Sequence, residues 1–156
     1  MKKIILVLVI AAVSVSSCNK NLPEIGATSA KRMANEWWVQ IFDGTTDIAG
    51  GYHKFMTYNT ADNADSIWVD DLEHGWQFKV KAKADYNALT FTTAQAQNEY
   101  YNIKVDLTGK VLLNAAHSKA GNITDSIYMQ AKFTDDPGKI YVIRGHARTR
   151  FSVDEY

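Results

Sequence analysis

The sequence is poor in cysteine, with Cys18 alone among its 156 residues. A single thiol cannot form a disulfide within the chain, and it excludes a zinc site made of several cysteines. An excess of one charge is also missing, since 17 Lys and Arg balance 17 Asp and Glu. Without a basic excess, the chain lacks the electrostatic footprint of a nucleic-acid-binding protein. We therefore expect no nucleic-acid partner and a fold stabilised by an ordinary hydrophobic core.

Long hydrophobic runs are missing as well. The longest apolar stretch, Ile4–Val13, has ten residues, whereas a helix needs about 20 to cross a bilayer. This stretch follows Lys2 and Lys3, and a short apolar run behind positive residues is typical of a secretory signal peptide. We therefore expect residues 1–17 to be a signal peptide that is removed from the mature protein.

The cysteine directly follows this segment. Val15-Ser16-Ser17-Cys18 resembles the lipobox of bacterial lipoproteins, in which small residues precede the cysteine that receives lipid. The motif predicts that Cys18 is lipidated and that the mature protein is attached to a membrane of the cell envelope. The alternative is an ordinary secretory signal with a cysteine in that position by chance.

The mature chain divides into a tether and one domain. Residues 18–30 are polar, contain a proline and a glycine, and show no apolar periodicity, which is typical of a linker. Residues 31–156 are enough for a single domain with its own core. A short helix is expected over Ala30–Asn35, because Thr28 or Ser29 can cap its first turn.

From residue 36 onward, apolar and polar residues alternate, as expected for strands with one buried face. The clearest alternation predicts three sets of inward residues: Trp76, Phe78, Val80 and Ala82; Tyr101, Ile103, Val105 and Leu107; Ile127, Met129, Ala131 and Phe133. Further strands are expected over Glu36–Phe42, Tyr52–Tyr58, Ser66–Asp70, Ala88–Thr92, Lys110–Asn114 and Lys139–Phe151. Turn residues such as Asp43-Gly44, Thr108-Gly109 and Asp136-Pro137-Gly138 separate these segments.

These segments predict an all-β fold of eight or nine strands. Short consecutive connections favour antiparallel neighbours, and a meander of this size closes most readily as an up-and-down barrel of about eight strands. A barrel of that size is either filled by side chains or holds one small ligand. A β-sandwich is the alternative architecture.

Several motifs occur along the chain in the order of a known family. They are the lipobox, Asn35-Glu36-Trp37-Trp38-Val39, Gly109-Lys110-Val111-Leu112, Asp125-Ser126-Ile127-Tyr128 and Gly145-His146-Ala147-Arg148-Thr149. Over nearly all of residues 30–156 the chain resembles the Bacteroidota lipoprotein family described as "lipid-binding putative hydrolase". Arg150 stands where the family pattern has a glycine. The resemblance implies a lipocalin-like or calycin-like barrel.

A location also follows from the lipobox and the resemblance. We expect a lipid anchor in the outer membrane. Acidic residues directly after the lipidated cysteine tend to mark surface export in this group, and Asn19-Lys20-Asn21 lacks them. The periplasmic side of the membrane is therefore favoured over the cell surface.

Motifs for catalysis are missing. The chain has no G-x-S-x-G elbow, no H-E-x-x-H pair and no glycine-rich phosphate loop. Its four histidines, His53, His74, His117 and His146, fall in different predicted strands and turns. The acidic turn Asp70–His74 does not have the spacing of a calcium loop. The sequence thus favours a protein without enzymatic activity, cofactor or metal, although the family description includes hydrolysis.

The last predicted strand carries cationic side chains on one face. Arg144, His146 and Arg148 occupy alternate positions, opposite a more apolar set. Three arrangements are open. The cations face solvent, or Arg148 stacks on Trp37 or Trp38 at the barrel end, or the cations face the interior and hold an acidic ligand head.

The favoured interpretation is a lipid-anchored envelope protein that binds a small apolar or amphipathic ligand, such as a lipid, in its barrel. An esterase-like hydrolase on the same barrel and a ligand-free structural or assembly component of the envelope are the alternatives. The oligomeric state does not follow from the sequence. The candidate ligand-binding residues are Trp37, Trp76, Phe78, Tyr101, Arg144, His146 and Arg148.

Overall fold

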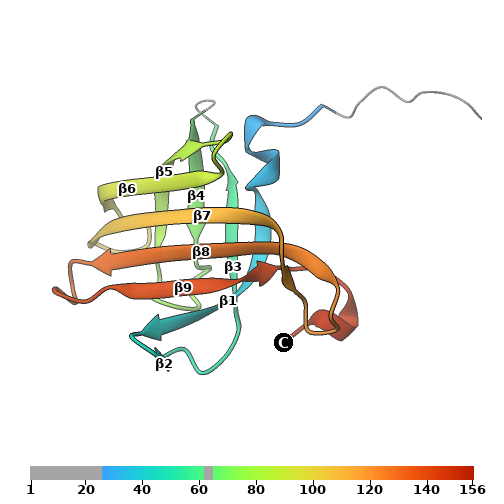
Figure 1. Cartoon of the computed structure of the whole chain (residues 1–156). Coiled ribbons are helices and arrows are strands. Elements are labelled where there is room, and N and C mark those ends of the chain that lie inside the picture. Colours follow the sequence, from blue (N-terminus) through green and yellow to red (C-terminus); the bar gives the residue numbers. More distant parts are fainter. Residues whose placement is uncertain (1–25, 62–64) are drawn as a thin grey trace, which may run out of the picture.

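The computed structural model describes residues 26–61 and 65–156 (Figure 1). The regular elements are nearly all strands. In chain order they are β1 (Asn35–Asp43), β2 (Thr46–Asp47), β3 (His53–Asn59), β4 (Ser66–Asp70), β5 (Lys79–Asp85), β6 (Thr90–Gln97), β7 (Lys104–His117), β8 (Ile123–Phe133) and β9 (Tyr141–Ala147). The helices of the described residues are two short 3-10 helices, η2 (Ser29–Arg32) and η3 (Ser152–Asp154).

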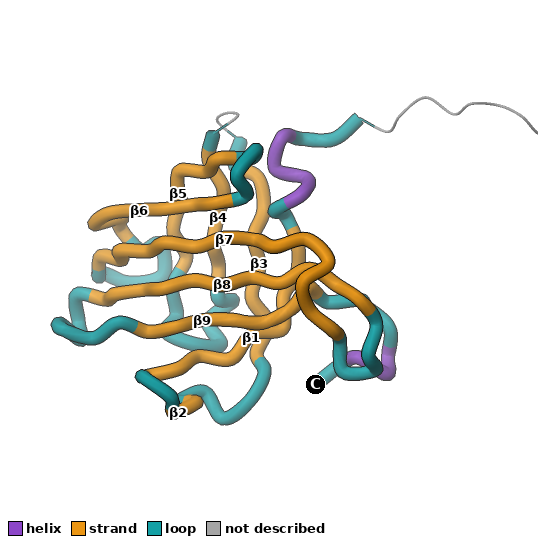
Figure 2. The backbone as a smooth tube through the Cα atoms, viewed as in Figure 1, coloured by secondary structure: helices purple, strands orange, loops and turns teal. Residues whose placement is uncertain are grey.

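The strands form one closed antiparallel barrel. Each strand from β3 to β8 pairs with the next, and β1 pairs with both β3 and β9, which closes the sheet. The short β2 adds to the edge of β1. In Figure 2, β6–β9 run across one wall, while β3 and β4 run behind them at a steep angle. The prediction of an all-β up-and-down barrel of about eight strands is confirmed.

Burial alternates along the strands as the sequence predicts. In β5 and in β8 from Ile127 onward, every second side chain is buried. Trp76 and Tyr101 break the pattern, because they lie in the loops that precede β5 and β7. Gln77 has a φ of 58°, which interrupts the extended backbone between Trp76 and β5. The prediction that Trp76 and Tyr101 belong to strands is therefore wrong, as is the inward position of Tyr101, whereas Trp76 does pack against the core.

The segment before β1 is less helical than expected. The helix predicted over Ala30–Asn35 is only the single turn η2, and the Thr28 side chain makes no capping hydrogen bond. Asn35 already belongs to β1, where it pairs with Thr57 of β3. Pairing with the sheet thus replaces the second helical turn.

The turn expected at Thr108-Gly109 is also absent, because β7 runs without a break through both residues. Gly109 lies opposite Phe91 of β6. A side-chain carbon at Gly109 would lie 2.3 Å from Phe91 Cζ, so the phenyl ring occupies the space beside the glycine. This glycine allows close packing between strands and does not reverse the chain.

Side chains fill the barrel interior. The buried apolar residues form one contiguous cluster, and its largest fully buried members include Trp37, Phe55, Phe78 and Tyr141. The rings of Phe55 and Phe78 meet edge to face with their centroids 5.8 Å apart. Removal of this apolar surface from water is the main driving force for the fold.

The barrel closes where β9 meets β1. Gly145 pairs with Val39 at this seam. A side-chain carbon at Gly145 would lie 1.8 Å from the Trp38 carbonyl oxygen and 2.7 Å from Val39 Cα. Because a real Cβ does not approach backbone atoms so closely, only glycine permits this spacing of the two strands.

We expect Gly145→Ala to lower the free energy of unfolding by about 3 kcal/mol or more, because the added methyl group meets backbone and not a flexible side chain. Urea unfolding followed by tryptophan fluorescence measures the loss. Gly26→Ala is the control, since nothing lies within 4 Å of a Cβ there. Equal stability of the two variants would show that the seam does not depend on a glycine.

Candidate functional site

The candidate residues from the sequence do not converge on one cavity. Two lie in the core, two at one end of the barrel, two on the outer face of β9 and one directly after β9: Trp37 and Phe78; Trp76 and Tyr101; Arg144 and His146; Arg148. The alternate residues of β9, such as Tyr141 and Ile143, belong to the core cluster. The cations of β9 therefore point outward, and the arrangement in which they face the interior is wrong.

The two core residues are surrounded by protein. Trp37 and Phe78 are both 0% exposed, and Trp37 Nε1 donates a hydrogen bond to Thr57 Oγ1 at 2.8 Å. Two sizeable hollows, of about 530 and 490 Å³, lie over the outer faces of β5–β7 and β6–β8. The rings of Trp37 and Phe78 thus act as packing groups, and the open volume lies on the outer surface.

Trp76 and Tyr101 come together at the barrel end formed by the β4–β5, β6–β7 and β8–β9 connections. The Trp76 ring stacks on Phe133 at 4.7 Å with 8° between the planes. Trp76 Nε1 and the Tyr101 hydroxyl both donate to the Asp135 carboxylate, at 3.1 and 2.9 Å. Trp76 therefore covers the core at this end.

A buried carboxylate shapes the loop that carries Trp76. Asp71 is 0% exposed, and its Oδ1 accepts hydrogen bonds from the amides of Glu73 and Phe78 at 3.0 and 2.9 Å. Its Oδ2 has no hydrogen-bond partner. Burial raises the pKa of the Asp71 carboxyl to about 6, although the backbone hydrogen bonds act in the opposite direction. Asp71 thus stabilises the turn at the cost of a buried, partly unpaired carboxyl group.

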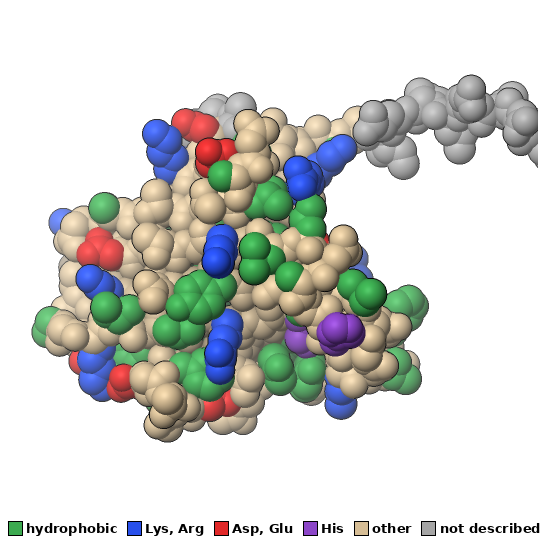
Figure 3. Space-filling model, in the orientation of Figure 1, with side chains coloured by type: hydrophobic (Ala, Val, Ile, Leu, Met, Phe, Trp, Pro, Cys, Tyr) green, Lys and Arg blue, Asp and Glu red, His purple; other side chains and the backbone are tan. Residues whose placement is uncertain are grey.

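Arg144 and His146 line a groove of about 330 Å³ on the outer face of the barrel, which we call the outer groove. Strand pairing places Gln40 of β1 opposite Arg144, and Ser126 of β8 opposite His146. In Figure 3, histidine and hydrophobic side chains gather near the right-hand part of this face. The groove is lined by Gln40, Tyr52, Ala116, His117, Ser126, Arg144, Gly145 and His146.

Arg144 is the permanent positive charge of the outer groove. Its guanidinium carbon lies 4.4 Å from the centroid of the Phe42 ring. Among the described residues, Arg144 forms no ion pair with a carboxylate. The ring positions the guanidinium but does not neutralise it, so its hydrogen-bond donors remain available to an anion.

His146 and Ser126 of the groove are hydrogen-bonded to other groups. His146 is 4% exposed, and its ring nitrogens lie 3.1 Å from the Ala147 carbonyl oxygen and 3.2 Å from the Tyr156 hydroxyl. Ser126 Oγ donates to the Gly145 carbonyl oxygen at 3.2 Å. The groove therefore has polar groups for binding, but Ser126 and His146 are not arranged as a nucleophile and its base.

The C-terminal tail covers the neighbouring part of this face. The Tyr156 ring lies 5.4 Å from the Trp38 ring and 4.2 Å from the Tyr52 ring. Arg148 holds the tail by donating to Glu155 at 2.8 Å and to Glu36 of β1 at 2.6 Å. The hydrogen bond from Arg148 is the main cause that holds the pKa of Glu36 below its ordinary value of 4.5. Arg148 thus ties the tail to the first strand.

The sequence left open that Arg148 stacks on Trp37 or Trp38, and the structure shows a related contact with Trp38. The Arg148 guanidinium carbon lies 6.0 Å from the centroid of the Trp38 ring, which is within the range of a cation–π contact. This contact lies on the outer surface at the seam of β1 and β9. Arg148 therefore acts as a structural link, because its donors are already taken by two carboxylates.

Sequence reasoning missed the residues that complete the groove, namely Gln40, Tyr52, His117 and Ser126. A signal for one of them was present. In a closed meander the first and last strands pair, so the outward residues of Glu36–Phe42 must lie beside the outward residues of β9. That pairing brings Gln40 next to Arg144, whereas Tyr52 lies in the loop before β3 and His117 lies at the end of β7, beyond a register shift with β8.

Two further findings concern the described part of the chain, residues 26–61 and 65–156. No group of three or more His, Cys, Asp or Glu side chains there has an arrangement that could hold a metal ion. In the same residues, no helix has the length and hydropathy required to cross a membrane.

We expect Arg148→Ala to lower the free energy of unfolding by about 1–2 kcal/mol, because two carboxylates lose a partner that is only partly exposed. Arg150→Ala is the matched control, since Arg150 is 68% exposed and has a single 3.4 Å ion pair with Glu36; its loss should stay within about 0.5 kcal/mol. Thermal unfolding of the two variants tests these two expected losses.

The loss should also depend on pH, and thermal unfolding repeated across pH tests this. Because Arg148 lowers the pKa of Glu36, its contribution to stability is complete above the ordinary Glu pKa and is lost as the pH falls through the lowered pKa of Glu36. The deficit of Arg148→Ala should therefore shrink below about pH 4.5, and equal losses in the two variants would contradict this role.

Comparison with known proteins agrees with the motif order. No curated protein matches the chain. A family model described as lipid-binding putative hydrolase matches residues 22–152, a range that contains all nine strands and the outer groove. The chain therefore belongs to the lipid-binding putative hydrolase family.

Proposed function

We propose that this protein binds a small anionic, lipid-like ligand in the outer groove, and that it does so without hydrolysing it. The observation that carries the proposal is Arg144, an arginine that is stacked on Phe42 and has no carboxylate partner among the described residues. The family description and the barrel support ligand binding in general. The lipid-like ligand, its site and the absence of catalysis are our proposal.

The polar lining suits an acidic head group. Arg144 supplies a charged donor, and the side chains of Gln40 and Ser126 lie on the adjacent strands of the same outer face. Hydrogen bonds from arginine to a carboxylate or phosphate are among the stronger ones available to a protein. Gln40 Nε2 already donates to Asp47 Oδ2 at 2.9 Å, and Ser126 Oγ donates to the Gly145 carbonyl oxygen. Arg144 is therefore the donor that an anion would gain without displacing an existing ion pair.

The apolar part of such a ligand has a path beside the groove. Leu112 of β7 pairs with Ser126, and Ser126 pairs with His146, so all three belong to one row across the outer face. Leu112 is 45% exposed. An acyl chain laid over this leucine would cover apolar surface that now faces water.

The filled interior favours the outer groove over the barrel lumen as the ligand site. A ligand in the lumen would have to displace fully buried side chains such as Trp37, Phe55 and Phe78. Displacing large core side chains costs several kcal/mol each. Binding on the outer face requires no such rearrangement.

We expect Arg144→Ala to weaken binding of a fluorescent fatty acid roughly ten- to a hundredfold, because one charge-assisted hydrogen bond is worth about 1.5–3 kcal/mol. Ser126→Glu should weaken it as well, since it places a negative charge in the groove. Lys104→Ala is the control, because Lys104 is an exposed cation at the far end of β7. Melting temperatures should stay nearly unchanged in all three. Unchanged affinity in Arg144→Ala and Ser126→Glu would overturn the site.

We also propose that the protein is a lipoprotein of the cell envelope, anchored in the outer membrane on its periplasmic side. Cys18 and the signal peptide over residues 1–17 lie outside the described residues, so this proposal depends on the sequence: on the lipobox, on the family resemblance and on the absence of acidic residues in Asn19-Lys20-Asn21. Cys18→Ala should abolish acyl labelling and move the protein from the membrane fraction to the soluble fraction of its own cells. Unchanged labelling and membrane association would contradict the anchor.

A further inference from the structure

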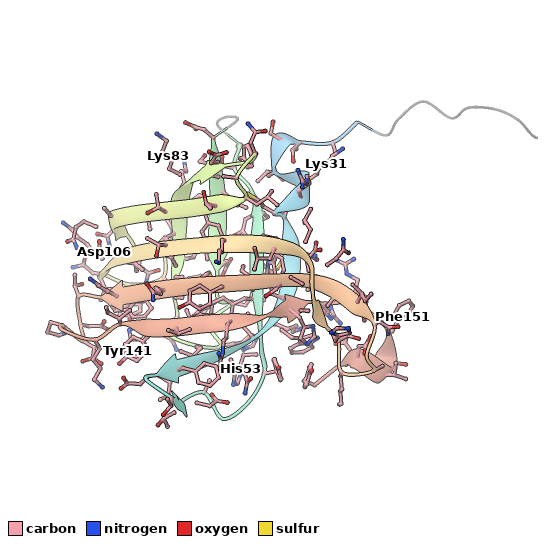
Figure 4. All side chains as sticks on the ribbon, in the orientation of Figure 1. Lys31, His53, Lys83, Asp106, Tyr141 and Phe151 are labelled. Carbon is pink, nitrogen blue, oxygen red and sulfur yellow. The ribbon has the colours of Figure 1, made fainter. Side chains whose placement is uncertain are left out.

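The barrel end that carries the β7–β8 connection exposes three large apolar side chains. Ile123 is 67% exposed, Phe151 is 62% exposed and Val153 is 64% exposed. We call these three residues the apolar tip. Phe151 lies at the outer edge of this end in Figure 4. Large apolar side chains exposed together are typical of an interaction surface.

Hydrogen bonds hold the segments of the apolar tip together. Asp154 of η3 is 1% exposed and accepts hydrogen bonds from the Ala120 amide at 2.6 Å, Asn122 Nδ2 at 3.2 Å and Thr149 Oγ1 at 2.6 Å. These bonds fix η3 against the connection that leads into Ile123. The hydrogen bond from Thr149 is the largest cause that lowers the pKa of Asp154 to about 2. The tip is therefore a preformed surface that is held open to solvent.

Basic side chains flank the apolar tip, whereas the neighbouring carboxylates are used within the protein. Arg150 is 68% exposed, and its ion pair with Glu36 is long at 3.4 Å, so most of its guanidinium faces water. Lys119 Nζ donates to the Glu155 carbonyl oxygen at 2.9 Å and keeps its charge at the surface. The Glu155 carboxylate is held by Arg148. The positive charges around the tip are thus the ones that face outward.

This combination matches a lipid surface. Hydrocarbon accepts exposed apolar side chains, and head-group phosphates attract the lysine and arginine beside them. The start of β1 lies at the same end, because the Arg148 amide donates to the Glu36 carbonyl oxygen at 2.8 Å. The chain therefore enters the barrel beside the apolar tip.

We infer that this end of the barrel docks on a phospholipid bilayer. The apolar tip enters the acyl region, and Lys119 and Arg150 contact the head-group phosphates. The inference does not depend on a ligand in the outer groove. It adds a membrane contact made by the folded domain to whatever the N-terminal segment contributes.

The opposite barrel end has a different surface. Its isoleucines are less exposed, with Ile48 at 45% and Ile140 at 48%. Its exposed tyrosines direct their hydroxyls into the protein, where Tyr100 donates to Asp70 at 2.6 Å and Tyr101 donates to Asp135 at 2.9 Å. The asymmetry predicts which end of the barrel faces a bilayer.

Single fluorophores on full-length protein test this orientation. Val153→Cys and Ile140→Cys, each combined with Cys18→Ser, carry one environment-sensitive label at opposite ends. The probe surface is vesicles of phosphatidylethanolamine and phosphatidylglycerol. Both proteins have the same N-terminal segment, so binding through that segment is common to the two.

We expect the label at position 153 to shift to the blue on addition of vesicles and to be quenched severalfold more by nitroxide lipids than by iodide. The label at position 140 should stay accessible to iodide. Phe151→Ser should reduce the blue shift at position 153 at least severalfold, whereas Ile48→Ser should not. These results together would support docking by the apolar tip.

Three outcomes would overturn the inference. One is an absence of any vesicle-dependent change at position 153. Another is an equal response of the two labels. The third is protection of position 153 without vesicles, accompanied by a doubled mass in light scattering, because that result would assign the tip to contact with a second copy of the chain.

Discussion

The close approach of β9 to β1 at Gly145 is the constraint on which the rest of the structure depends. The meander reaches this seam last, and the barrel closes only because no side chain stands between Gly145 and the Trp38 carbonyl group. Closure removes the sheet edges that an open meander would leave unpaired. It also fixes the register in which the outward residues of the first and last strands face each other.

That register determines the chemistry of the outer surface. Because Gly145 pairs with Val39, Arg144 lies beside Gln40 and His146 lies beside Trp38. A shift by one residue would turn these side chains into the core and bring the apolar set outward. The outer groove and the attachment of the tail are therefore consequences of how the barrel closes, and they do not require a separate folding element.

The sequence predicted the barrel well because its signal is local. Apolar and polar residues alternate within each strand, so the inward residues of β8 were predicted correctly without knowledge of the neighbouring strands. Gly109 shows the limit of local reasoning. Next to Thr108 it has the composition of a turn, but the Phe91 ring on the adjacent strand explains it. Long-range packing decided between the two interpretations.

The candidate site was harder to predict, because its residues meet only after closure. Arg144 and His146 were identified from their alternation, but whether they faced inward or outward depended on the side chains opposite them. Tyr52 lies in the loop just before β3, although the sequence predicted it as the first residue of that strand. Tyr156 belongs to the C-terminal tail, and both rings contact His146. Only the folded seam brings these rings to one place.

The large core residues favour the filled one of the two forms that an eight-stranded barrel can take. A barrel of this size is wide enough for one small ligand only if its inward residues are small. Here Phe55, Phe78 and Phe133 project inward together with Trp37 and Tyr141, and ring-to-ring contacts such as that of Phe78 with Phe133 at 5.4 Å occupy the lumen. Packing these rings stabilises the fold, but it also fills the volume that a ligand would need. We therefore propose that recognition in this barrel takes place on its outer face, where alternate residues of the same strands carry charge.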